Sequence, residues 1–238
     1  MKNKKLPGLI QIIKNSFQIY FQKENLLYFL KIVLLSFGIT LALMIPVMLL
    51  VGLFSTQSPI EKIGPATTVF IPTIVLALAV AVWGLLMQAT IVVSVSRVVS
   101  GRSLAVKETI KIAWGKLGRF FLTNFLVGLI IVVGFIFLII PGIVFAIWYI
   151  FAQYIVITQD LSPLEAIKAS KKLVSGHFWP VFGRIAGIML FSIIIQVALG
   201  SVRFVGAIAT VILSPYYVLV LYLLYDGLRK LNAKASVV

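Results

Sequence analysis

Residues 120–158 read FFLTNFLVGLIIVVGFIFLIIPGIVFAIWYIFAQYIVIT, and this stretch contains no charged side chain. A helix needs about 20 mostly apolar residues to cross the roughly 30 Å of bilayer hydrocarbon, and this stretch is about twice that length. Pro141-Gly142 interrupts it near the middle. Proline cannot continue the hydrogen-bond ladder of a helix, and glycine permits a reversal. The sequence therefore predicts two spanning helices, residues 120–140 and 143–158, joined by a hairpin turn at Pro141 and Gly142.

The whole chain has the composition of a membrane protein. Of its 238 residues, 61% are hydrophobic and 11% are charged, whereas a soluble domain carries about 25% charged residues. Lipid can solvate such an apolar surface, and water cannot. The absence of cysteine excludes disulfides, thiolate metal sites and cysteine nucleophiles.

Four further apolar runs are long enough to span a bilayer. They are residues 26–54, 69–95, 181–199 and 205–225. We therefore predict an all-α, polytopic membrane protein that is a single integral membrane domain, residues 1–238, with six transmembrane helices arranged as three hairpins.

Charge predicts the orientation. The formal net charge is +15, and nearly all of the basic residues flank the apolar runs. They gather in four segments: the N-terminus up to Lys31, residues 97–119, residues 168–184, and residues 229–234. Only Lys62 and Arg203 fall on the other side. Because cytoplasmic loops accumulate lysine and arginine, both termini should be cytoplasmic, in the cytoplasmic (inner) membrane. The expected partners are the lipid bilayer and its anionic phospholipid headgroups, and no nucleic acid.

Three basic segments have the spacing of amphipathic helices, with apolar side chains on one face and polar ones on the other. They are residues 8–23, 104–118 and 163–175. Each carries an Ile-Lys-x-small signature: Ile13-Lys14-Asn15-Ser16, Ile110-Lys111-Ile112-Ala113 and Ile167-Lys168-Ala169-Ser170. We predict three repeats of a cytoplasmic interfacial helix followed by a hairpin, over residues 8–100, 104–158 and 163–226. The alternative is that basic amphipathic connections occur in any protein that obeys the charge rule.

Other residues have predicted structural roles. Ser162 and Glu165 fit a capping box before the third amphipathic helix, with Pro163 at its first position. Gly183 and Gly187 form a Gly-x-x-x-Gly spacing that suits close helix packing. The candidate contacts to anionic lipid are Lys14, Lys111, Lys168, Lys171 and Lys172.

No catalytic constellation is visible. The chain has one histidine, His177, and six acidic residues, none of them in the middle of a predicted span, which disfavours a proton-coupled transporter. Ser175-Gly176-His177 resembles part of the phosphatidic acid phosphatase signature, but the second histidine that this chemistry needs is missing. We therefore expect no enzyme activity, no metal and no cofactor. A site formed by His177, Asp160 and Arg184 would reverse that expectation.

One region resembles a known family. Its motifs are Ile140-Pro141-Gly142-Ile143, the run from Asp160 to Ser170, and Gly176-His177-Phe178-Trp179. Together they resemble the membrane domain of some bacterial glycerophosphoryl diester phosphodiesterases and of related uncharacterised six-helix inner-membrane proteins. The resemblance implies the membrane domain only. Those phosphodiesterases carry catalysis on a separate soluble barrel, so no catalytic residue is transferred.

The leading hypothesis for function is a non-catalytic membrane module that organises or binds lipids or partner membrane proteins. The alternative is a small permease or channel, suggested by polar residues at membrane depth such as Gln88, Asn124 and Gln196. A membrane-embedded lipid enzyme is the least favoured class.

Overall fold

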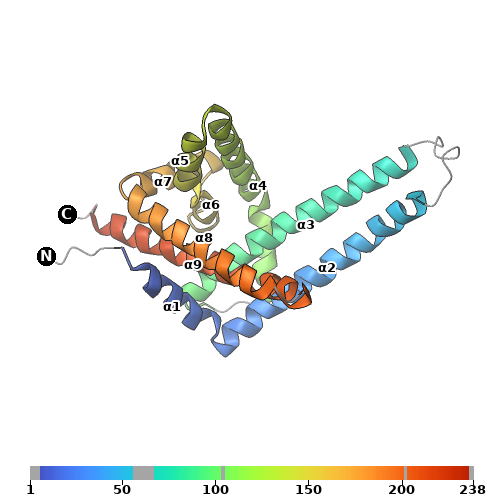
Figure 1. Ribbon diagram of the computed structural model, residues 1–238, viewed down its shortest axis with the longest axis horizontal. Helices are drawn as coiled ribbons and strands as arrows, with labels where there is room; N and C mark the ends of the chain where they lie inside the picture. Colours follow the sequence, from blue (N-terminus) through green and yellow to red (C-terminus); the bar gives the residue numbers. More distant parts are fainter. Residues whose placement is uncertain (1–5, 56–66, 103–104, 201–202, 236–238) are drawn as a thin grey trace.

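The computed structural model describes residues 6–55, 67–102, 105–200 and 203–235. These residues form helices and short connections, with no strand among them (Figure 1). The helices are α1 (Leu9–Tyr20), α2 (Lys23–Ser55), α3 (Thr67–Val99), α4 (Val106–Phe137), α5 (Ile139–Tyr149), α6 (Ala152–Thr158), α7 (Pro163–Ser175), α8 (Phe178–Gly200) and α9 (Arg203–Ala235).

Six segments are long and apolar enough to cross a membrane. They are Lys23–Leu49, Pro72–Val99, Val106–Phe137, Ile139–Thr158, Phe178–Ala198 and Thr210–Ala233. The all-helical class and the six apolar segments predicted from the sequence are therefore confirmed, and we describe the chain as a multi-pass membrane protein. Lys62, one of the two basic residues predicted on the opposite side, lies outside the described residues.

The helices pack tightly at one end of the molecule and spread at the other. Figure 1 shows α2 and α3 running side by side away from the remaining helices, while α4 packs on α5 and α8 on α9. Buried side chains gather where α1, α6 and α7 meet the last turns of α3 and α9, a region we call the base. In the most apolar 18-residue stretch of Thr210–Ala233, 50% of the residues are buried, whereas in that of Lys23–Leu49 only 11% are buried. Lipid must therefore cover most of the outer helix surface.

The second predicted amphipathic helix is not a separate element, which corrects the sequence analysis. Residues 106–137 form one continuous helix, α4. No proline interrupts this stretch. Lys116 and Arg119, the two charged residues nearest its apolar part, form ion pairs with Asp160. Their charges are thereby compensated, and the helix can continue from its polar into its apolar portion without a break.

The reversal between α4 and α5 occurs at Leu138 rather than at Pro141-Gly142. Leu138 has extended backbone angles (φ −165°, ψ 152°) between the two helices. Pro141 lies in the first turn of α5, where its missing N–H costs nothing. Gly142 packs against α4, because a Cβ there would lie 2.5 Å from the ring of Phe135. The glycine thus permits close helix contact and does not form the turn.

The fourth predicted span, residues 143–158, is also broken. α5 ends at Tyr149 and α6 begins at Ala152. Phe151, in the break, is fully buried, and the Tyr154 and Ile155 N–H groups both donate to its carbonyl. Non-helical backbone at membrane depth is tolerated only where protein surrounds it. Burial by α4, α7 and α3 therefore allows this break.

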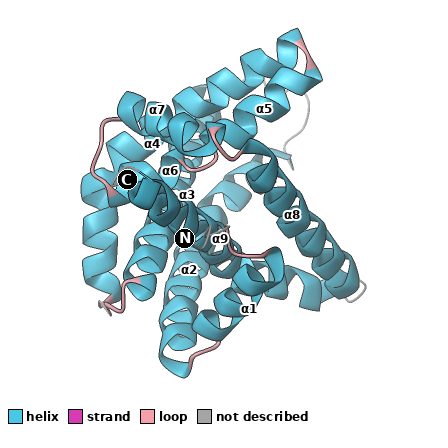
Figure 2. Ribbon diagram, turned by 90° about the vertical axis from the view of Figure 1, so that its left-hand side faces the viewer, coloured by secondary structure: helices cyan, strands magenta, loops and turns pink. Residues whose placement is uncertain are grey.

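The amphipathic segments pack in a cyclic order. α1 lies mainly on α9, and α7 lies mainly on α6 together with α4 and α5 (Figure 2). The first turns of α4 pack on the α2–α3 pair, where the Tyr28 and Thr109 hydroxyls are 2.6 Å apart. Each segment therefore lies on the preceding helix pair, and α1 closes the ring on the last one. Three repeated units would produce this order, although the repeat itself stays a prediction.

The Ile-Lys-x-small signature has a packing role. Its small residues, Ser16, Ala113 and Ser170, are each 0% exposed. Small side chains let a helix approach its neighbour closely. The lysine two positions earlier is rotated by about 200° on a helix of 3.6 residues per turn. Lys14, Lys111 and Lys168 consequently point away from the protein, and all three are exposed.

α1 is attached to α9 next to a proline. Pro215 has no N–H, so the Val211 carbonyl one turn earlier lacks its usual helical donor. The Ser214 hydroxyl donates to the Val211 carbonyl at 2.8 Å, and the Tyr20 hydroxyl of α1 donates to the Ile212 carbonyl at 2.5 Å. Tyr20 is 1% exposed, and this burial raises its pKa to about 12. The hydroxyl therefore stays protonated and able to donate.

Candidate functional site

The predicted lipid-contacting lysines lie on the surface of three different helices. Lys14, Lys111 and Lys168 are exposed on α1, α4 and α7. Lys171 is also exposed, and its ammonium lies 4.6 Å from the centre of the Trp148 ring, a cation–π contact. Lys172 is exposed in the last turn of α7, where its positive charge interacts favourably with the negative end of the helix dipole.

Large apolar side chains are exposed beside these lysines. Ile10 and Phe17 flank Lys14 on α1 and are 82% and 55% exposed, and Trp114, 61% exposed, follows Lys111 on α4. Trp179 is 75% exposed at the start of α8. Cations next to exposed aromatic and aliphatic side chains are typical of surfaces at the headgroup level of a bilayer.

The capping box of α7 is present as the sequence predicts. The Ser162 side chain accepts from the Glu165 N–H, and the Glu165 carboxylate accepts from the Ser162 N–H at 3.0 Å. Hydrogen bonds from the Ser162 side chain and backbone lower the pKa of Glu165. The cap fixes where α7 begins and so sets the direction in which Lys168 points from this helix.

The predicted glycine pair does not form a helix–helix contact between spans. Gly183 is exposed, with no atom within 4 Å of a Cβ placed on it. A Cβ on Gly187 would meet the Leu9 side chain of α1 at 2.5 Å. Between these glycines, the Arg184 guanidinium donates to the backbone carbonyls of Leu6 and Pro7 at 3.1 and 2.9 Å. This face of α8 therefore holds the N-terminal segment.

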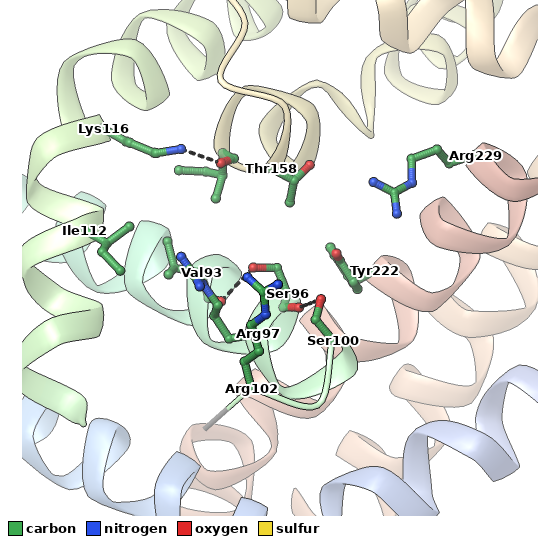
Figure 3. Close-up of a pocket in the computed structure, with 11 residues that line it drawn as sticks. Val93, Ser96, Arg97, Ser100, Arg102, Ile112, Lys116, Thr158, Tyr222 and Arg229 are labelled. Atoms are coloured by element: carbon green, nitrogen blue, oxygen red, sulfur yellow. Dashed lines mark hydrogen bonds between the residues drawn. The ribbon is translucent and has the colours of Figure 1, made fainter. Parts of the chain in front are cut away.

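A cavity of about 270 Å³ opens at the base between the ends of α3, α4, α6 and α9. Four cationic side chains line it: Arg97, Arg102, Lys116 and Arg229. Figure 3 shows Arg97 and Arg102 beside each other below the cavity, with Lys116 and Arg229 at opposite sides. The remaining lining residues are Val93, Ser96, Ser100, Ile112, Ile157, Thr158 and Tyr222. We call this cavity the basic pocket.

Two of the four cations are paired. The Lys116 ammonium lies 3.2 Å from the Asp160 carboxylate and donates to the Ile157 carbonyl at 2.8 Å. Asp160 also accepts a hydrogen bond from Arg119. The pKa of the Asp160 carboxyl is lowered mainly by Lys116 and to a smaller extent by Arg119. Arg229 pairs with Asp226 at 3.1 Å. These carboxylates lie outside the lining of the pocket.

The other two cations are unpaired. Among the described residues, the guanidinium groups of Arg97 and Arg102 have neither a carboxylate nor a hydrogen-bond acceptor. The Tyr222 hydroxyl likewise has no partner there, although Tyr222 is only 4% exposed and lines the pocket. The pocket therefore offers three unused donor groups and a surplus of positive charge.

A second cavity of about 200 Å³ lies between α2 and the end of α3. Its lining includes Glu24, Asn25 and Tyr28 from α2, and it shares Arg102 with the basic pocket. Glu24 and Arg102 both line this cavity, but no ion pair joins them in the described part of the chain.

Sequence reasoning missed the basic pocket. Its residues lie on or next to four helices and span more than a hundred positions, and the sequence pattern indicates only an orientation role for the arginines. A usable signal is the Ser96-Arg97 and Ser100-Gly101-Arg102 pattern at the end of an apolar helix, which places polar groups one turn apart.

The residues considered above for a catalytic site have separate partners in the structure. No cluster of three or more histidine, aspartate or glutamate side chains occurs among them. Asp160 binds Lys116 and Arg119, whereas Arg184 binds backbone carbonyls of the N-terminal segment. These two residues thus have separate partners, and they do not form the site with His177 considered above.

The polar residues at membrane depth do not line a common cavity. Gln88 and Gln196 are exposed on the outside of their helices, and the Asn124 amide donates to the Phe120 carbonyl of its own helix. The permease or channel alternative therefore gains no support from them.

A family model described as an uncharacterised protein family, UPF0259, matches residues 66–225. The chain belongs to this uncharacterised family. The UPF0259 match covers more than half of the chain and includes the stretch that resembles the phosphodiesterase membrane domain. It bears out the expectation of an uncharacterised family and does not support the phosphodiesterase name. No curated protein and no solved structure matched the chain.

The UPF0259 region contains most of the basic pocket. Arg97, Arg102, Lys116 and Tyr222 lie inside the matched residues, whereas Lys14 and Arg229 lie outside them. The pocket is thus largely a feature of the matched stretch.

Proposed function

We propose that this protein is a non-catalytic membrane module whose base binds the anionic headgroups of the surrounding lipid. One observation carries the proposal: Lys14, Lys111 and Lys168 are exposed on three helices whose buried small residues hold them facing away from the protein. Each lysine near an anionic membrane surface contributes about 1 kcal/mol of attraction.

The neighbouring apolar side chains support a membrane surface as the partner. Phe17 on α1 and Trp114 on α4 are more than half exposed close to these lysines. A soluble acidic partner would leave such side chains in water, whereas a bilayer accepts both the apolar body and the charged head. We place this face on the cytoplasmic side, because the basic segments lie there under the positive-inside rule.

The test compares lipid selectivity before and after the three charges are removed. The chain is reconstituted in vesicles with spin-labelled phosphatidylglycerol or phosphatidylcholine, and the fraction of motionally restricted lipid is measured by electron paramagnetic resonance. The wild type should prefer phosphatidylglycerol, and K14Q/K111Q/K168Q should lose most of that preference. Raising the ionic strength should weaken the preference of the wild type as well.

The matched control is K14R/K111R/K168R, which preserves charge at the same positions and should retain the preference. Equal selectivity in the glutamine triple variant and the wild type, with both proteins folded, would remove the basis of the proposal.

A further inference from the structure

We propose that the basic pocket is a binding site for a single phosphate monoester group, held chiefly by Arg97 and Arg102 and by the Tyr222 hydroxyl. This inference deepens the proposed function by naming the ligand of one part of the same basic face. It differs from general lipid attraction because it predicts one stoichiometric ligand and discrimination between phosphate esters.

The charge in the pocket favours binding of an anion. Arg97 and Arg102 line the same cavity, and neither has a carboxylate partner in the described part of the chain. Figure 3 shows the two side chains beside each other. Two neighbouring guanidinium groups repel each other, although Arg102 is exposed and Arg97 is half-buried, so water screens part of that repulsion. A bound anion replaces the repulsion with two attractions.

The charge surplus sets the charge of the ligand. Asp160 pairs with Lys116 and Arg119, and Asp226 pairs with Arg229 and Lys230, so each carboxylate is shared between two cations. At least the two positive charges of Arg97 and Arg102 are therefore left without a carboxylate partner among the described residues. A phosphate monoester carries about −1.5 to −2 charges at neutral pH, whereas a diester carries about one. The monoester matches the surplus more closely.

The donor geometry also favours a monoester. A guanidinium presents paired N–H groups that fit two phosphate oxygens at once. Two arginines together with the Tyr222 hydroxyl can engage three terminal oxygens, the number that a monoester has and a diester lacks. The hydroxyls of Ser96, Ser100 and Thr158 already donate to helix carbonyls, so they are not available as donors to the ligand.

The position of the pocket suits a ligand at the membrane surface. Its walls combine the polar end of α3 with buried apolar residues, Val93 and Ile157, which are 2% and 5% exposed. The phosphate could belong to a lipid such as phosphatidic acid or to a soluble phosphate ester. Both carry the same chemical group, and the experiment separates them.

The experiment uses the full chain in phosphatidylcholine nanodiscs. Three probes are compared: phosphatidic acid and phosphatidylglycerol added to the disc, and glycerol 3-phosphate added to the buffer. Lipid retention is measured by native mass spectrometry, and soluble binding by isothermal titration calorimetry. The wild type should retain one phosphatidic acid in preference to phosphatidylglycerol. R97Q and R102Q should each lower the affinity by on the order of tenfold or more.

Two further variants keep the test decisive. Y222F removes one donor without altering charge and should weaken the monoester while leaving the weaker diester binding nearly unchanged. K107Q, at an exposed lysine on α4 that does not line the pocket, is the control for loss of one charge and should bind as the wild type does. If R97Q fails to fold, R102Q and Y222F still decide the outcome.

Each outcome has a defined meaning. Binding of phosphatidic acid alone identifies a lipid headgroup, and binding of glycerol 3-phosphate as well identifies a site for soluble esters. Equal retention of phosphatidic acid and phosphatidylglycerol overturns the inference, as does unchanged binding in R102Q and Y222F. K14Q/K111Q/K168Q should still bind the monoester, so failure of the proposed lipid selectivity can be told apart from failure of the pocket.

Discussion

The contact between α4 and α5 gives the sharpest test of the fold. A Cβ on Gly134 would lie 2.7 Å from a ring carbon of Phe145, 3.0 Å from the Gly142 Cα and 3.1 Å from the Gly142 nitrogen. Unstrained carbon contacts need about 3.5–4.0 Å, so the two helices would have to separate by about half an ångström or more. Two of the three contacting atoms belong to the backbone and cannot rotate away.

Gly134→Ala should therefore destabilise the protein. Overpacking of this kind costs about 1–3 kcal/mol, from which the helix propensity gained by alanine subtracts up to about 1 kcal/mol. Gly128→Ala is the matched control, because it lies on the same helix with no atom within 4 Å of its Cβ. It has the propensity gain without the clash. The two variants should differ by about 1–3 kcal/mol.

The assay is unfolding in mixed micelles of increasing dodecyl sulfate content, followed by tryptophan fluorescence. Trp148 on α5 lies close to the tested contact, because its ring packs on Phe145. Gly134→Ala should unfold at a lower dodecyl sulfate fraction than Gly128→Ala. Coincident unfolding curves for the two variants would refute the close backbone approach and, with it, the reversal at Leu138.

Three other outcomes follow from single contacts. Tyr20→Phe removes the hydroxyl that donates to the Ile212 carbonyl and should cost about 0.5–1.5 kcal/mol, measured by the same unfolding assay; an unfolding curve that coincides with that of the wild type would argue against the anchor. Ser162→Ala should cost about 1 kcal/mol. Because the pKa of Glu165 is lowered in the folded protein, the ionised cap stabilises α7 at pH values above the unfolded pKa of about 4.3, and this stability is lost as the pH falls through the folded pKa. Ser162→Ala should therefore also reduce the acid dependence of α7 unfolding, measured by hydrogen exchange. Asp160→Asn frees the Lys116 ammonium and should raise the affinity of the basic pocket for a phosphate monoester in calorimetry, and a decrease would contradict the charge argument.

Elements with a local cause could be predicted from the sequence. α7 begins at Pro163 and ends at Ser175, as predicted, because Ser162, Pro163 and Glu165 form a cap within four residues. The six apolar segments follow from hydropathy alone. The exposure of Lys14, Lys111 and Lys168 follows from helical periodicity, which sets them apart from the small residue two positions later.

Elements with a tertiary cause could not. The reversal at Leu138 depends on the approach of Gly134 and Gly142, two residues whose contact no local pattern predicts. The break at Ile150 and Phe151 contains neither proline nor glycine, and it persists because neighbouring helices bury it. The role of Gly187 depends on Leu9, which lies far away in the sequence.

The basic pocket illustrates the same limit at the level of the site. Arg97 and Arg229 are separated by more than a hundred residues, and the sequence cannot show that they face one cavity. It also cannot show which cations lack a carboxylate. That distinction comes from the ion pairs of Asp160 and Asp226, and it decides which side chains are available to a ligand.

The most direct measurement is the sidedness of the three signature lysines. The chain has no cysteine, so Lys14→Cys, Lys111→Cys and Lys168→Cys each create a single thiol for a membrane-impermeant maleimide. In sealed vesicles of one known orientation, all three thiols should react from the same side, the cytoplasmic one. Labelling of any one of the three from the opposite side would contradict a common headgroup-binding base.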